Sequence, residues 1–148
     1  MKLRPTRNNE PVPTYRIINL IFAIIILLIF LYSALYSHKE VNHPIPSVFS
    51  EITGSESPST GLSRAFSALM QCDVKSAREL NSYALQIFLF FVFQLVFRTF
   101  NFFLTKTNFS WINTYILADI TLSILFFLLA FRPLILFTFE LFRNFIVN

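Results

Sequence analysis

The sequence predicts an all-α membrane protein with three transmembrane helices, an external loop containing amphipathic helices, and an amphipathic C-terminal tail. Three observations lead to this fold class. Apolar residues make up 55% of the 148 residues and charged residues only 14%, whereas charged residues make up about a quarter of a typical soluble domain. Three apolar runs are long enough to cross a bilayer. The basic residues are placed unevenly around those runs, which is typical of a membrane topology signal.

Residues 1–16 form a basic N-terminal tail, and residues 17–36 form the first predicted transmembrane helix. The run IINLIFAIIILLIFLYSALY contains no charged residue. At 1.5 Å per residue, about 20 residues cross a hydrocarbon core of roughly 30 Å. A cleaved signal peptide is the alternative, but its apolar run is usually about 7–15 residues long and ends at a small-residue cleavage site. We therefore expect an uncleaved signal anchor.

Residues 37–82 form the predicted external loop, which holds both glycines of the chain. From Gly61 onward, apolar residues recur at helical spacing, and they are Leu62, Ala65, Phe66, Leu69 and Met70. This pattern predicts an amphipathic helix that lies on the membrane surface with its apolar stripe toward the lipid.

Polar residues at the expected helix starts predict where each helix of the loop begins. Ser59 or Thr60 is expected to cap the amphipathic helix, because a side-chain oxygen there can accept a backbone N–H bond. Asp73 is expected to cap a second helix over VKSAREL, and Asn81 or Ser82 to cap the next transmembrane helix.

Residues 83–104 and 111–131 are the second and third predicted transmembrane helices, joined by a short turn over residues 105–110. Residues 132–148 form the amphipathic C-terminal tail, in which Pro133 either begins a new helix or kinks a continuing one. We expect an interfacial helix or a kinked extension rather than a full fourth span, because too few residues remain to cross the bilayer. A short re-entrant segment stays open as an alternative.

The basic residues predict the orientation of the chain. Ahead of residue 17 there are four of them against one acid, and they are Lys2, Arg4, Arg7 and Arg16. Lys106 adds a positive charge to the turn after the second span, whereas the loop over residues 37–82 has no positive excess. By the positive-inside rule, the N-terminus and the turn are cytoplasmic and the loop is external. The expected location is the inner membrane of a bacterium.

The stretch TGSESPSTGLSRA, residues 53–65, resembles the signature of small bacterial integral-membrane proteins known as domain of unknown function 2752. That pattern is approximately Thr-Gly, two variable residues, Cys-Pro-x-Cys-Gly-x-Thr-Arg-Ala, and later an Asn-Pro before a span. The matching positions here are Thr53, Gly54, Pro58, Gly61, Arg64, Ala65, Ala77 and Asn81.

The departures from this family pattern matter for function. Ser57 and Thr60 occupy the two cysteine positions, Ser63 replaces the threonine, and Ser82 replaces the proline. Hydroxyls do not replace thiolates in zinc binding or disulfide exchange. The resemblance therefore implies that any thiol chemistry of the family is lost here. What remains is structural, with Gly54 and Gly61 shaping the backbone, Pro58 fixing a turn and Arg64 supplying a fixed cation.

Polar residues inside the predicted spans form the second candidate site. In the second span they lie at spacing i, i+4, i+7 and share one face, and they are Gln94, Arg98 and Asn101. In the third span the corresponding face carries Tyr115, Asp119 and Ser123. A hairpin turning near residue 108 places Arg98 and Asp119 at nearly equal depth. Because a lone charge in hydrocarbon is costly, we expect an ion pair that joins the two helices. A proton or ion relay is the alternative.

Other candidate sites have less support in the sequence. Ser57, Ser59 and Ser63 lack a recognisable base and oxyanion hole, so we expect no catalytic residue. His38, His43 and Glu40 could form a surface metal site, but a solvated loop is preferred. The single cysteine, Cys72, forms no internal disulfide and no zinc motif is present. We therefore expect no metal and no cofactor.

The expected function is that of a non-enzymatic accessory or scaffold subunit of a larger membrane complex. Its partners would be the lipid bilayer and other integral-membrane proteins, since 20 phenylalanines provide apolar surface and little chemistry. The scattered basic residues do not suggest nucleic-acid binding. The alternatives are a degenerate member of a thiol- or metal-dependent membrane enzyme family and a small carrier that uses a polar face with Arg98 and Asp119.

Overall fold

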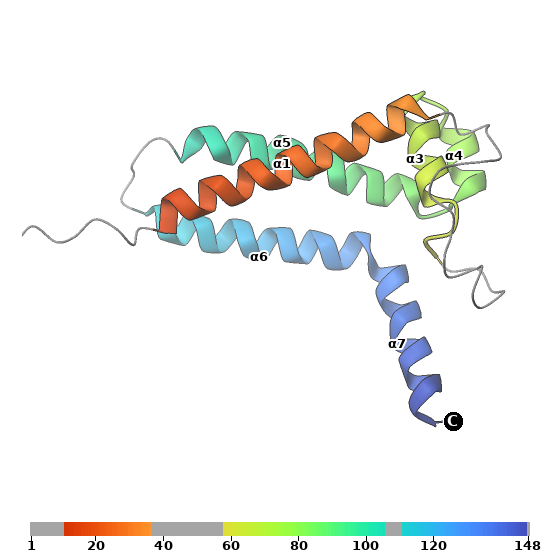
Figure 1. Ribbon diagram of the computed structural model, residues 1–148. Helices are drawn as coiled ribbons and strands as arrows, with labels where there is room; N and C mark the ends of the chain where they lie inside the picture. The colour runs from red at the N-terminus through yellow and green to blue at the C-terminus, as the bar shows by residue number, and fades with distance from the viewer. Residues whose placement is uncertain (1–10, 37–57, 106–110, 148) are drawn as a thin grey trace, which may run out of the picture.

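The computed structural model describes residues 11–36, 58–105 and 111–147, and within these ranges the chain forms six helices and no strand. The helices are α1 (Pro11–Leu35), α3 (Leu62–Met70), α4 (Val74–Leu80), α5 (Ala84–Leu104), α6 (Ile112–Ala130) and α7 (Arg132–Val147). Helices α1, α5 and α6 run side by side, α3 and α4 cover one end of this bundle, and α7 turns steeply away from it (Figure 1). The all-α fold class is confirmed.

Three of these helices are long and apolar enough to cross a membrane, over Val12–Leu35, Ala84–Leu104 and Ile112–Ala130. The chain is therefore an integral membrane protein. Helices α5 and α6 begin and end within one residue of the predicted spans. Helix α1 begins at Pro11, whereas the predicted span begins at residue 17. The apolar run stops at the polar boundary of the membrane, but the helix can continue through that boundary. There, the Arg16 guanidinium carbon lies 5.4 Å from the centre of the Phe102 ring.

Helix α1 packs mainly against α5 and α3. Its buried residues recur at intervals of three, four or seven and form one face along most of the helix; they are Tyr15, Asn19, Ile26, Phe30 and Ser33. The opposite side of α1 is covered with exposed leucine and isoleucine, which suits contact with lipid. The first span is thus held against α5 and α3 along a single face that carries both polar and apolar side chains.

Helices α3 and α4 cover the end of the bundle where α1 ends and α5 begins, here called the capped end (Figure 1). The core at this end is built largely from alanines, which let the helices approach closely. Its buried members are Ala65, Ala68 and Leu69 of α3, Ala77 of α4 and Ala84 of α5.

The apolar stripe of α3 faces other helices, so the prediction that this stripe faces lipid is wrong. The stripe packs against α1, α4 and α5, and Ser67, a polar residue beside it, is completely buried. An apolar stripe indicates burial but does not distinguish a protein partner from a lipid one, which is why the sequence pattern misplaced it.

The predicted caps are partly confirmed. The N-cap residue of α3 is Gly61 rather than Ser59 or Thr60. Asp73 caps α4 as predicted, because its Oδ1 accepts the Ser76 backbone N–H at 3.0 Å. Asn81 acts just before α5, where its Oδ1 accepts the Tyr83 backbone N–H at 2.9 Å.

Asn81 also ties the start of the described loop to the junction of α4 and α5. Its Nδ2 donates to the carbonyl oxygens of Pro58 and Thr60, both at 2.8 Å. Gly61 follows with φ of +75°, a left-handed conformation that favours glycine. A Cβ atom at Gly61 would lie only 2.5 Å from the backbone oxygen of Leu80. The turn over residues 58–61 therefore docks too closely for any larger residue at this position.

Helices α5 and α6 are joined near the capped end by aromatic rings and one hydrogen bond. Phe90 lies 6.1 Å from Phe127 and 5.6 Å from Phe131, measured between ring centres. Gln86 Nε2 donates to the carbonyl oxygen of Ala130, the last residue of α6, at 3.0 Å. These contacts fix the position at which α6 ends.

Helix α7 begins after a single intervening residue, Phe131. Pro133 is its second residue, where the missing N–H would have no helical partner. The tail is therefore a separate helix that follows a sharp bend, and it does not fold back along α6 (Figure 1).

We expect Gly61→Ala to destabilise the capped end, because the new methyl group meets the Leu80 backbone and the left-handed conformation disfavours alanine. The expected cost is about 1–3 kcal/mol. Thermal unfolding in mild detergent measures it, with the exposed Ser82→Ala as the matched control. An unfolding midpoint for Gly61→Ala equal to that of the control would contradict the docking of this turn.

Candidate functional site

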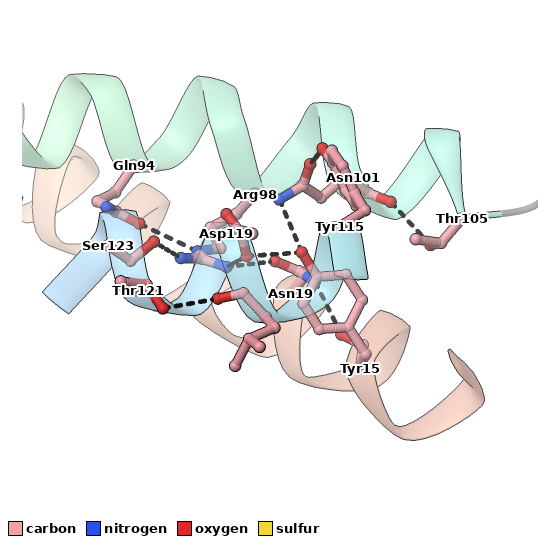
Figure 2. A network of polar contacts seen from close by, with 11 residues as sticks. Tyr15, Asn19, Gln94, Arg98, Asn101, Thr105, Tyr115, Asp119, Thr121 and Ser123 are labelled. Atoms are coloured by element: carbon pink, nitrogen blue, oxygen red, sulfur yellow. Dashed lines mark hydrogen bonds and ion pairs between the residues drawn. The ribbon is translucent and has the colours of Figure 1, made fainter. Parts of the chain in front are cut away.

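A group of polar side chains lies buried between α1, α5 and α6 (Figure 2). We call it the polar cluster, and its members are Tyr15, Asn19, Gln94, Arg98, Asn101, Tyr115, Asp119 and Ser123. All three membrane-spanning helices contribute to it. Polar groups placed at this depth are costly unless they find partners, so their pairing decides what the cluster can do.

The centre of the polar cluster is an ion pair between α5 and α6. Arg98 Nη1 lies 2.7 Å from Asp119 Oδ2. Arg98 is 8% exposed and Asp119 is 3% exposed, so both charges are enclosed by the protein. The predicted pair is confirmed, and so is the depth that the hairpin geometry assigned to it.

Arg98 binds every helix of the membrane bundle. Within its own helix, Nε donates to Gln94 Oε1 at 3.0 Å. Toward α1, Nη1 donates to Asn19 Oδ1 at 2.9 Å. Toward α6, Nη2 donates to Ser123 Oγ in addition to the bond to Asp119. The planar guanidinium suits this role because its five N–H donors point in fixed, divergent directions.

Asp119 is in turn bound by α1. Tyr15 donates its hydroxyl to Asp119 Oδ2 at 2.6 Å. The same Tyr15 oxygen accepts a bond from Asn101 Nδ2 at 2.9 Å, and Asn101 Oδ1 accepts one from the Tyr115 hydroxyl. A continuous chain of hydrogen bonds therefore runs from the ion pair toward the end of the bundle where α1 begins (Figure 2).

The polar cluster lies nearer to the end of the bundle at which α1 begins than to the capped end. Arg98 is six residues before the end of α5 at Leu104, and Asp119 is seven residues after the start of α6 at Ile112. At 1.5 Å per residue, each lies about 10 Å from the end of its helix. The pair is therefore about 3 Å from the midpoint of α6 and about 6 Å from that of α5, on the side at which α1 begins.

Comparisons with protein-family models, with curated proteins and with solved structures returned no match. What the polar cluster does is therefore inferred from its own geometry.

Two atoms at the centre of the polar cluster have no hydrogen-bond partner. Asp119 Oδ1 and Gln94 Nε2 are both buried and unpaired, although each side chain is bonded through its other polar atom. One is an acceptor and the other a donor. A bound water or a transferred proton is the kind of species that such atoms can accommodate.

The structure brings four of the predicted site residues together and places the others elsewhere. Gln94, Arg98, Asn101 and Asp119 meet in the polar cluster, as their spacing predicted. Pro58, Gly61 and Arg64 lie at the capped end, with Arg64 half-buried in α3. Gly54 lies outside the described residues.

Two members of the polar cluster were missed by the sequence analysis. Both lie in α1, but Tyr15 belongs to the segment interpreted as a basic N-terminal tail and Asn19 to the span interpreted as an apolar anchor. Asn19 Nδ2 also donates to the Tyr15 carbonyl at 2.9 Å, one turn earlier in α1. A signal for them was present, because Asn19 is the one amide side chain in residues 17–36 and Tyr15 stands four residues before it.

The structure adds no support for a metal site or a nucleophile within the residues that it describes. Among the residues that the structure describes, no group of three or more His, Cys, Asp or Glu side chains could hold a metal ion. The hypothetical surface site at His38, Glu40 and His43 lies outside those residues, as does Ser57. Cys72 is exposed, and its φ of +62° places it in the turn after α3.

We expect the ion pair to show strong coupling in a double-mutant cycle of Arg98→Met and Asp119→Leu. Each single change leaves a buried charge without its partner and should cost about 3–5 kcal/mol, whereas removing both charges should cost less than either. Unfolding of the purified protein from mild detergent into sodium dodecyl sulfate measures these losses. Arg78→Met, at an exposed arginine of α4, is the control and should have little effect. Simple addition of the two losses would contradict the pair.

Proposed function

We propose that this chain is a small, non-enzymatic integral-membrane subunit that packs against other integral-membrane proteins. The observation that carries the proposal is the pairing inside the polar cluster. The two charges buried between the spanning helices bind one another and side chains of this same chain. Groups used in this way hold helices together and are not displayed toward a substrate.

The surface of α6 supports a role in association. In the most apolar 18-residue stretch of α6, only 6% is buried inside the protein, against 22% in the corresponding stretch of each of the other two spanning helices. Large apolar side chains are exposed along the whole helix; they include Leu117, Ile120, Ile124, Leu125, Leu128 and Leu129. Such a surface meets either lipid or a neighbouring helix, and we propose the neighbouring helix.

Purification of the tagged chain from its native membrane tests the proposal. We expect it to co-purify with a larger membrane complex in a fixed ratio. A photo-crosslinking residue at Ile124 should form a protein adduct, whereas one at Leu28, on the exposed side of α1, is the matched lipid-facing control. Purification of the chain alone, with no adduct at Ile124, would contradict the subunit role.

We further propose a bacterial inner-membrane location with a cytoplasmic N-terminus. The basic residues before residue 17 support it by the positive-inside rule. In this orientation the capped end, and with it Cys72, faces the outside.

The single, exposed cysteine is a native reporter of this orientation. A membrane-impermeant maleimide should label Cys72 in intact spheroplasts, and Cys72→Ser should abolish the labelling. A cysteine introduced as Asn8→Cys in the Cys72→Ser chain should react only after the membrane is permeabilised. The reverse pattern would mean that the N-terminus is external.

The resemblance to the domain of unknown function 2752 remains a proposal, and one arrangement supports it. Three matching positions, Pro58, Gly61 and Asn81, meet at the capped end, where Asn81 binds the Pro58 carbonyl and Gly61 approaches Leu80. These are the structural parts of the pattern, and they do not depend on the lost cysteines.

A small carrier or proton relay is the second candidate function, favoured by the unpaired Asp119 Oδ1. Proton flux into sealed vesicles that contain the purified protein and a pH-sensitive dye tests it. Flux that Asp119→Asn abolishes would support the relay, and background flux in the unmodified protein would exclude it.

A further inference from the structure

We infer that α7 is an interfacial helix that lies along the membrane surface at the capped end, with its apolar face in the lipid and its charged face among the headgroups. The partner of this face is thus the boundary of the lipid bilayer. The inference rests on the direction of α7, its length and the distribution of its side chains, and it does not depend on the proposed function.

The end of α6 places the start of α7 at the membrane boundary. Helix α6 has 19 residues, which at 1.5 Å each extend about 28 Å and match the hydrocarbon thickness. It follows Trp111, an exposed residue of the type enriched at membrane boundaries. Its other end is one residue from α7, so α7 starts where the hydrocarbon ends.

The direction of α7 keeps it near that boundary. The helix leaves the end of α6 at a steep angle to the bundle (Figure 1). Among the described helices it approaches only α6. Its 16 residues extend about 24 Å, which is too short to cross the bilayer comfortably. A helix that turns steeply away from the spans at this depth runs close to the surface.

The side chains of α7 divide into two faces. Arg132, Glu140 and Arg143 stand at positions i, i+8 and i+11, which brings them to one side of the helix, and Asn144 lies beside them. All four are exposed. The other side carries the large exposed apolar residues Leu141 and Phe142, whereas Phe139 and Ile146 stand closer to the two arginines.

Water cannot be the environment of that apolar face. Leu141 is 47% exposed and Phe142 is 62% exposed within the protein. Large apolar side chains are stabilised when they leave water for an apolar environment. Lipid supplies that environment without a partner chain. The two arginines are meanwhile placed where lipid phosphates can pair with them.

Tryptophan fluorescence with brominated lipids tests the inference on the full chain in vesicles of phosphatidylcholine and phosphatidylglycerol. The chain contains one tryptophan, so Trp111→Phe provides a silent background. Phe142→Trp places the reporter on the apolar face, and Glu140→Trp, on the charged face, is the matched control. Normal monodisperse purification of each variant confirms that it has folded.

We expect the reporter at 142 to emit at short wavelength and to be quenched more strongly by bromines near the headgroup end of the acyl chains than by bromines near the bilayer centre. The reporter at 140 should emit at longer wavelength and be quenched at least twofold less. Water-like emission without quenching at 142 would overturn the inference, and so would strongest quenching from the bilayer centre, which indicates insertion. Short-wavelength emission that lipid bromines do not quench, and that changes on tenfold dilution with lipid, would overturn it in favour of packing against a second copy.

Discussion

The pairing of Arg98 with Asp119 is the constraint on which the arrangement of the spanning helices depends. Two opposite charges on different helices cannot be left apart in a low-dielectric environment, because isolated ions there carry a large desolvation cost. Their contact at 2.7 Å fixes both the depth and the rotation of α6 relative to α5. Asn19 and Tyr15 then bring α1 into the same arrangement through hydrogen bonds to the two charges.

The polar cluster supplies a specific orientation that apolar packing alone does not. Helix α6 has few buried apolar side chains, so its position depends unusually strongly on Asp119, Ser123 and the aromatic contacts near its end. At the capped end the requirement is different. There, alanines and a glycine let the short helices and the turn over residues 58–61 approach closely. The Asn81 side chain holds that turn by a hydrogen bond to a backbone carbonyl. The arrangement of the helices at the polar cluster thus depends on buried charges, and that at the capped end depends on close packing.

The sequence predicted the spans well because hydrocarbon thickness imposes a length that an apolar run must match. It also predicted the partners Arg98 and Asp119, because few polar residues interrupt those runs and each charge needs a counter-charge. It did not place Tyr15 and Asn19, since an amide and a phenol near the end of an apolar helix also occur without a partner. Nor did it place α3, because its stripe of Leu62, Phe66 and Leu69 fits lipid and protein equally well. Which of two apolar environments covers a face is set by tertiary packing and is not encoded in periodicity.

The most direct measurement of the central claim is the distance between the two charges in a lipid bilayer. The chain contains only two aspartates, Asp73 and Asp119, so labelling aspartate side-chain carboxyls with carbon-13 and arginine guanidinium groups with nitrogen-15 gives few signals in solid-state nuclear magnetic resonance. The account predicts a strong dipolar coupling at the Asp119 carboxyl that corresponds to direct hydrogen bonding and disappears in Arg98→Met. The absence of that coupling in the unmodified chain would contradict it and would mean that the spans are held together without the ion pair.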